Sequence, residues 1–197
     1  MPPHASSSLQ AVSGRATGVL FFAGFGALWL CAGLSSIHLL TWPRLALAVA
    51  LPAVFLLAPA IWLLKTLPAA PADENRSAEE QRISRVFGRV NAAQWIGIVL
   101  VVVLLNVLHR PELIVPAVAL IVGLHLFPLA GLFRYKPHYV TGTALVLWAV
   151  IAPLRFNTAA TISAAAALGA AAILLSSAAF NLYSAIGTAC KLSTSRA

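Results

Sequence analysis

Long apolar runs separated by short polar breaks recur along the whole chain, and this pattern predicts a polytopic membrane protein. A helix rises about 1.5 Å per residue, so about 20 apolar residues cross the hydrocarbon core of a bilayer. The runs predict one all-α domain over residues 17–190, a bundle of six transmembrane helices. Their expected bounds are about 17–40, 45–64, 91–108, 113–133, 140–154 and 158–188.

Three polar segments lie outside these runs. Residues 1–16 are rich in serine, with prolines at positions 2 and 3, and we expect a disordered N-terminal tail there. Residues 191–197 are expected to form a short C-terminal tail. The third segment, residues 72–90, lies between the second and third runs, in the only substantial loop of the chain.

The segment 72–90 predicts an amphipathic helical arm, because its apolar residues recur at helical spacing while arginines occupy the other faces. The apolar residues are Ile83, Val86, Phe87 and Val90, and the arginines are Arg82, Arg85 and Arg89. Such a helix either lies on the membrane surface with its arginines toward anionic headgroups or extends the third span. It is also where a protein partner would dock, although a solvated anchor for the third span explains the same pattern.

Small residues, prolines and polar residues inside the spans indicate helix contacts. In the first span, Gly26 and Gly33 are seven residues apart and offer a small face for close packing. In the second, Pro52 and Pro59 each leave a carbonyl four residues earlier without its donor, so this face should turn toward protein or water. The last turns of the sixth span carry a polar stripe of Ser177, Asn181, Ser184 and Thr188. Such a stripe lines an aqueous path or hydrogen-bonds to a neighbouring helix.

The basic residues predict how the chain is oriented. It contains 13 Lys and Arg against 5 Asp and Glu, with a formal net charge of +8. Six spans put both termini on one side, which holds ten of the basic residues, while only Arg44, Arg110 and Arg155 lie on the other. The positive-inside rule then places both termini in the cytoplasm of a bacterial-type inner membrane. Because the basic residues are scattered at span ends, the charge predicts contact with the lipid bilayer and no nucleic-acid partner.

All five acidic residues lie outside the expected spans, at Asp73, Glu74, Glu79, Glu80 and Glu112. Proton- and sodium-coupled transporters usually use a carboxylate inside the membrane, and phosphoryl-transfer enzymes use carboxylates to hold their metal. No Gly-rich phosphate loop is present either, and no nucleophile is paired with a base and an orienting third group. The sequence therefore favours a protein that is not an enzyme, and it predicts no cofactor.

His125 is the only ionisable residue deep within an expected span, and it is the main candidate site residue. Pro128 cannot donate to the carbonyl of Leu124, so we expect a free acceptor beside the imidazole. This pair would bind a small polar ligand, relay a proton, or coordinate a metal or haem. A neutral imidazole that hydrogen-bonds to a neighbouring helix fits the same pattern.

Two further groups of residues are weaker candidates. His38, His109 and Glu112 all fall at the outer ends of spans, and they would form a metal site if the first and third spans touched. Interfacial polar residues are the simpler interpretation. Around the fourth-to-fifth connection, a basic and aromatic group predicts a headgroup anchor. It comprises Arg134, Tyr135, Lys136, His138 and Tyr139.

Two functions are compatible with these patterns. The first is a permease or channel subunit, expected to be a homo-oligomer, that moves a small neutral or weakly charged solute past His125. It predicts water at His125 and along the stripe of Ser177, Asn181 and Ser184. The second is a non-catalytic membrane protein that binds a partner protein, a lipid or a cofactor, through the 72–90 arm or the region of His125.

Overall fold

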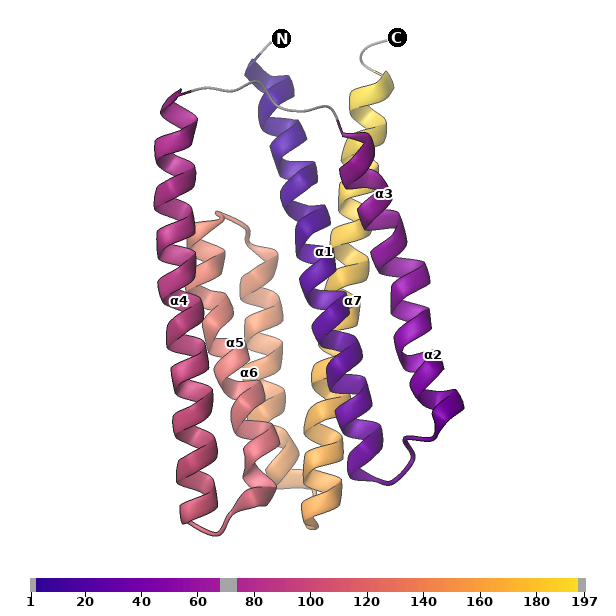
Figure 1. Cartoon of the computed structure of the whole chain (residues 1–197), viewed down its shortest axis with the longest axis vertical. Coiled ribbons are helices and arrows are strands. Elements are labelled where there is room, and N and C mark those ends of the chain that lie inside the picture. The colour runs from indigo at the N-terminus through magenta and orange to yellow at the C-terminus, as the bar shows by residue number, and fades with distance from the viewer. Residues whose placement is uncertain (1–2, 68–73, 195–197) are drawn as a thin grey trace.

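The protein is an all-α membrane protein, as the hydrophobic pattern predicts. The structure, a computed structural model, describes residues 3–67 and 74–194 (Figure 1). Within these residues, six helical stretches are long and apolar enough to cross a membrane. The elements are α1 Pro3–Ser36, α2 Trp42–Pro52, η1 Ala53–Leu57, α3 Ala58–Thr66, α4 Glu74–Val107, η2 Pro111–Leu113, α5 Ile114–Leu132, α6 Pro137–Arg155 and α7 Ala159–Thr194.

The antiparallel pair of α1 and α7 forms the most extensive helix contact in the bundle. Its buried residues recur at alternating spacings of three and four, which is the pattern of a coiled-coil seam. On α1 they are Leu9, Val12, Ala16, Val19 and Ala23, and on α7 they are Ala164, Ala167, Ala171, Leu174, Ala178, Asn181 and Ala185. Mostly small side chains let the two backbones approach closely.

Gly26 and Gly33 continue this seam on α1, which confirms the small-residue face expected there. A Cβ at Gly26 would lie 2.8 Å from the side chain of Leu175, and one at Gly33 would lie 2.6 Å from that of Leu168. Both leucines belong to α7, so each glycine makes room for a large side chain of the partner helix.

The expectation of a disordered tail over residues 1–16 is wrong from Pro3 onward, where α1 begins. The reason is the seam, because Val12 and Ala16 are completely buried against α7 and its neighbours. Residues 1 and 2 lie outside the described part of the chain. At the other end, α7 continues to Thr194, so the expected tail from residue 191 begins as helix.

The second span contains the disturbance expected from its prolines. Between α2 and α3 the backbone forms one π-helical turn, Ala53–Leu57, directly after Pro52 and before Pro59. A π-turn shifts the hydrogen-bond register by one residue, which accommodates a position where proline cannot donate.

The α5–α6 hairpin is much shorter than the helices around it. Each of its helices has 19 residues, whereas α1 and α4 have 34 and α7 has 36. At 1.5 Å per residue the hairpin is about 28 Å tall, close to the thickness of the hydrocarbon core. Figure 1 shows its turn well below the ends of the surrounding helices, on the side where both termini lie. The surrounding helices therefore project beyond the α5–α6 turn and leave a notch at this end of the bundle, with the turn at its base.

The 72–90 arm does not lie flat on the membrane surface but extends the third span, which is the second of the two arrangements expected for it. From Glu74 onward it is the first part of α4, and residues 72–73 are outside the described part. Its apolar face turns inward, since Phe87 and Val90 pack against the core and the Phe87 ring lies 6.2 Å from that of Phe133. Arg82, Arg85 and Arg89 are exposed on the outer side.

The close packing of α5 against α6 allows a direct test of the fold. We predict that Gly142→Ala lowers the free energy of unfolding by about 1–3 kcal/mol, because its Cβ would lie 2.8 Å from the carbonyl oxygen of Gly123 on α5. Gly187→Ala is the matched control on α7, where a Cβ meets nothing within 4 Å. It should raise stability by up to about 1 kcal/mol through helix propensity. Unfolding in detergent, followed by tryptophan fluorescence, measures both, and equal effects would contradict the close α5–α6 contact.

Candidate functional site

His125, the main candidate from the sequence, lies on α5 facing α4. Its imidazole is half-buried and interacts with the backbone of Val90, while its Nδ1 atom is buried without a hydrogen-bond partner. The Leu124 and Pro128 side chains are exposed on another face of the same helix. The structure therefore does not combine His125 and Pro128 into one concave site.

The polar stripe of α7 makes hydrogen bonds to neighbouring helices, the second of the two roles considered for it. The hydroxyls of Ser177 and Thr141 are 2.8 Å apart, which joins α7 to α6. Closer to the end of the bundle with both termini, Arg15 of α1 donates to the carbonyl oxygen of Ser184 at 3.2 Å and to Oγ1 of Thr188 at 2.9 Å. These bonds hold the upper part of the α1–α7 pair together.

Asn181 is a polar residue within the α1–α7 seam, and its side chain is satisfied by the α5–α6 turn. It is 2% exposed, and its Oδ1 accepts a hydrogen bond of 2.5 Å from the hydroxyl of Tyr135. The guanidinium carbon of Arg15 lies 6.0 Å from the centre of the Tyr135 ring. Burial raises the pKa of Tyr135, and the nearby Arg15 only partly opposes this, so the phenol stays protonated and remains a donor.

His138, in the first turn of α6, completes this group. Its ring makes edge contacts with Phe22 at 5.4 Å and Tyr135 at 5.0 Å between centroids. The residue is only 9% exposed, yet its Nδ1 atom has no hydrogen-bond partner. We call Arg15, Tyr135, His138 and Asn181 the Arg15–His138 cluster. It joins α1, α6, α7 and the α5–α6 turn at the base of the notch.

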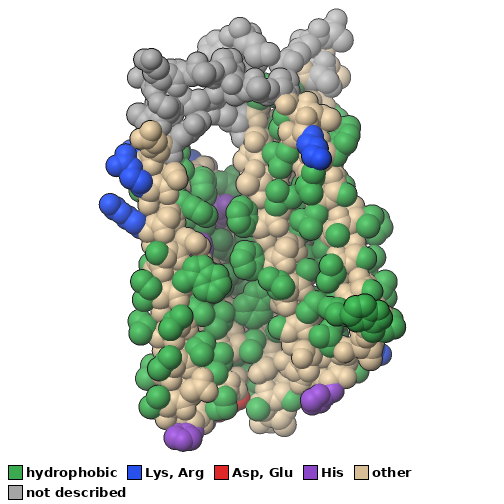
Figure 2. All heavy atoms as spheres, viewed as in Figure 1, with side chains coloured by type: hydrophobic (Ala, Val, Ile, Leu, Met, Phe, Trp, Pro, Cys, Tyr) green, Lys and Arg blue, Asp and Glu red, His purple; other side chains and the backbone are tan. Residues whose placement is uncertain are grey.

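A hollow opens beside this cluster on the face shown in Figure 2. It lies between α4 and α1, which make almost no contact with each other, and α5 and α6 lie behind it. Histidine atoms are visible inside the hollow. They belong to the α5–α6 hairpin, because the other described histidine side chains, His38 and His109, lie at the far end of the bundle.

Charged residues around this end are mostly basic. The side chains that the structure places there are all Lys or Arg, namely Arg15, Lys65, Arg82, Arg85, Arg89, Arg134, Lys136 and Lys191. The four acidic residues of the 73–80 segment belong to the same side, but the sequence gives this side ten basic residues in all. The hollow therefore opens at a positively charged end of the protein.

Comparison with known proteins identifies the chain only at the level of its family. Residues 9–182 match a family model described as "Family of unknown function (DUF7010)". The chain belongs to this family. No curated protein and no solved structure matches it. The matched range begins inside the segment that the sequence suggested was a tail, and it includes the whole Arg15–His138 cluster.

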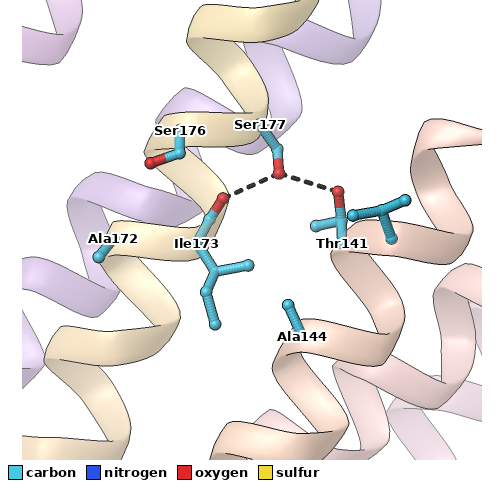
Figure 3. Close-up of a pocket in the computed structure, with 7 residues that line it drawn as sticks. Thr141, Ala144, Ala172, Ile173, Ser176 and Ser177 are labelled. Atoms are coloured by element: carbon cyan, nitrogen blue, oxygen red, sulfur yellow. Dashed lines mark hydrogen bonds between the residues drawn. The ribbon is translucent and has the colours of Figure 1, made fainter.

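This DUF7010 protein also has a groove between α6 and α7, with a volume of about 340 Å³ (Figure 3). Small side chains line it, including Ala144, Ala172 and Ser176. The hydroxyls of Thr141 and Ser177 at its upper edge are bonded to each other, and Ser177 also donates to the carbonyl of Ile173. Its mainly apolar wall has no free charged group, so it is a weaker candidate than the cluster.

The weak metal candidates His38, His109 and Glu112 are not brought together. No group of three His, Cys, Asp or Glu residues suited to a metal is found among the described residues. The loops that carry the two histidines lie on opposite sides of the bundle (Figure 1). The Oε1 atom of Glu112 instead lies 3.5 Å from the Nη1 atom of Arg110, two residues earlier in the chain.

The two histidines have a structural role at helix ends. His38 and His109 have φ values of 55° and 54°, in the left-handed region. The His109 N–H donates to Asn106 and the next N–H donates to Leu105, which is the Schellman pattern that closes a helix. Arg134 closes α5 in the same way, with a φ of 50°.

The helix-end role predicts the effect of glycine at His109. His109→Gly should raise the free energy of unfolding by about 1 kcal/mol, because a left-handed backbone costs a non-glycine residue about 1–2 kcal/mol. His109→Ala keeps the Cβ and should not stabilise. Thermal unfolding of both variants distinguishes this role from a metal site, for which both substitutions would be equally harmful.

The Tyr135–Asn181 bond gives a second prediction for this site. Tyr135→Phe should lower stability by about 1–3 kcal/mol, because it leaves the buried Asn181 oxygen without a donor. Tyr183→Phe is the matched control, since Tyr183 is 80% exposed on the same helix as Asn181. Chemical unfolding in detergent measures both. Equal stability of Tyr135→Phe and wild type would show that this bond does not hold the turn.

Proposed function

We propose that this protein is a non-catalytic membrane protein that binds a polar ligand in the hollow between α1 and α4. The observation that carries the proposal is the pair of unpartnered Nδ1 atoms at His125 and His138. Both are on the hairpin behind the hollow, and among the described residues they are the buried side-chain atoms without a partner. A buried polar atom without a hydrogen-bond partner lowers the free energy of unfolding by about 1–3 kcal/mol, unless a ligand or water bonds to it.

The packing of the opposite half of the bundle supports binding rather than passage. There, Leu168 fills the space at Gly33, and the indole of Trp148 covers Gly169 and donates to the carbonyl of Ala165 at 2.8 Å. These contacts close the α1–α7 and α6–α7 seams below the hollow. A path between these pairs of helices is therefore closed in that half of the bundle.

Transport of a small neutral or weakly charged solute is the second candidate. It is favoured by the different depths of the two nitrogens, since His138 begins α6 and His125 lies further along α5. It is also favoured by the loose attachment of α4, which packs mainly on α5 and has no buried residue in its most apolar stretch. Movement of α4 would open the path. The homo-oligomer expected for a permease stays a prediction.

Charge supports a location in a bacterial inner membrane with both termini in the cytoplasm. Ten basic residues lie in the segments on the terminal side, against Arg44, Arg110 and Arg155 on the other. A partner protein at the α4 extension would then be cytoplasmic. It would meet the exposed face of Arg82, Arg85 and Arg89, because the apolar face of this segment packs on the bundle.

Thiol labelling tests whether the hollow is open. In a chain whose native cysteines are replaced by serine, we expect His138→Cys and His125→Cys to react with a membrane-impermeant maleimide in inverted vesicles. Ser84→Cys, exposed on the α4 extension, is the positive control. Ala149→Cys, at a position that is 4% exposed within α6, is the negative control.

The side from which each position reacts separates the two functions. Labelling at 125 and 138 from the cytoplasmic side alone supports a binding site closed at its far end, whereas labelling at 125 from both sides supports transport. If both positions reacted only after denaturation, as Ala149→Cys should, the proposal of a ligand-accessible hollow would be wrong. Labelling of His109→Cys in intact cells, with none of Ser84→Cys, is the expected result for the proposed orientation.

A further inference from the structure

We infer that the ligand of the hollow is an anionic phospholipid, with its headgroup at the Arg15–His138 cluster and its acyl chains between α1 and α4. This inference rests on the proposed binding function and names the class of ligand. Four observations on the described residues support it: the height of the cluster, its charge, its unpartnered nitrogen and the open flank of the bundle.

The cluster lies at the height of lipid headgroups. The α5–α6 hairpin is about 28 Å tall, so its turn reaches one face of the hydrocarbon core. Tyr135 is in this turn and His138 directly follows it. The bond from Tyr135 to Asn181 and the contact of Arg15 with the Tyr135 ring hold α7 and α1 at the same level.

Arg15 supplies a positively charged group that is already in position. One terminal nitrogen, Nη1, is bonded to Ser184 and Thr188 of α7, which fixes the side chain against that helix. These partners are a carbonyl and a hydroxyl, so neither neutralises the guanidinium charge. A guanidinium that is held in this way presents a planar set of donors suited to a phosphate.

His138 supplies a second group that requires a partner. Phe22, Phe133 and Tyr135 pack around the edges of its ring. Its Nδ1 atom is buried without a hydrogen bond, in a residue that is 9% exposed. An imidazole N–H donates to a phosphate or glycerol oxygen. The Tyr135 ring contacts both the His138 ring and the guanidinium of Arg15, so all three belong to one cluster.

The flank of the bundle below the cluster is suited to acyl chains. Below the cluster, α1 and α4 face each other across the hollow with almost no contact, and both run through the membrane. Exposed side chains on the membrane-spanning parts of both helices are large and apolar, for example Phe21 and Phe25 on α1 and Trp95 and Val99 on α4. A ligand with an anionic head and apolar tails matches both the charge above and the surface below.

Thermal stability of the purified full-length protein in detergent tests the inference, with phosphatidylglycerol and phosphatidylcholine as probes. We expect phosphatidylglycerol to raise the Tm of the wild type in a saturable way and phosphatidylcholine to have little effect. Arg15→Gln should weaken the phosphatidylglycerol response about tenfold in concentration. Arg155→Gln, which removes a charge at the opposite end, should keep the wild-type response.

His138→Phe provides a variant that preserves the fold, because an aromatic ring remains among Phe22, Phe133 and Tyr135. It should keep its Tm in phosphatidylcholine and lose most of the additional stabilisation by phosphatidylglycerol. If Arg15→Gln does not fold because the bonds from Arg15 to α7 are lost, His138→Phe still tests the inference. A full phosphatidylglycerol response in His138→Phe would overturn the assignment of the headgroup to this cluster.

The remaining outcomes separate this inference from the proposed function. If inorganic phosphate or glycerol 3-phosphate stabilised the wild type as strongly as phosphatidylglycerol, the hollow would bind a soluble anion, and the lipid inference alone would be wrong. Equal stabilisation by phosphatidylglycerol and phosphatidylcholine would also overturn it, while leaving a ligand-accessible hollow intact. If no probe had an effect and position 138 stayed closed to maleimide, both proposals would fail.

Discussion

The rest of the structure depends on the close antiparallel contact of α1 and α7. Glycine and alanine at heptad spacing remove side-chain bulk from the seam, so leucines of α7 lie against the backbone of α1 at Gly26 and Gly33. This contact forms a central pair, against which α2 and α3 pack on one side and the α5–α6 hairpin on the other. The pair is longer than the hairpin, and the notch above the α5–α6 turn follows from that difference in length.

Polar side chains cluster where Asn181 interrupts the apolar seam between α1 and α7. Asn181 occupies a heptad position that is otherwise alanine or leucine, and its amide requires a partner because it is buried. The hydroxyl of Tyr135 meets this requirement, and Arg15 bonds to the next turns of α7. The same arrangement leaves His138 surrounded by aromatic rings without a partner for its Nδ1 atom. Binding of an anionic group there would give that nitrogen a partner and bring a negative charge to Arg15.

The spans and their number could be predicted from the sequence, because hydropathy reports directly on the cost of exposing polar groups to lipid. The helical start of α1 was missed because its serines and prolines suggested a tail. The signal that could have shown it is the spacing of Leu9, Val12, Ala16 and Val19, which continues the heptads of the first span. The Arg15–His138 cluster could not be predicted, since a single sequence does not show which helices adjoin. The sequence indicates His125 as an intramembrane histidine and His138 only as part of a headgroup anchor, although His138 is the more deeply buried in the structure.

The short α5–α6 hairpin ends at the membrane surface, while α7 continues beyond it. Electron paramagnetic resonance depth measurements on a cysteine-free chain in lipid nanodiscs test this directly. One nitroxide is placed at Lys136→Cys in the turn and another at Thr194→Cys, which is 13 residues, or about 20 Å, beyond Asn181 along α7. We predict a headgroup-level depth at position 136 and full water exposure at position 194. Equal depths at the two positions, with α7 tilted into the bilayer, would contradict the notch and the site built on it.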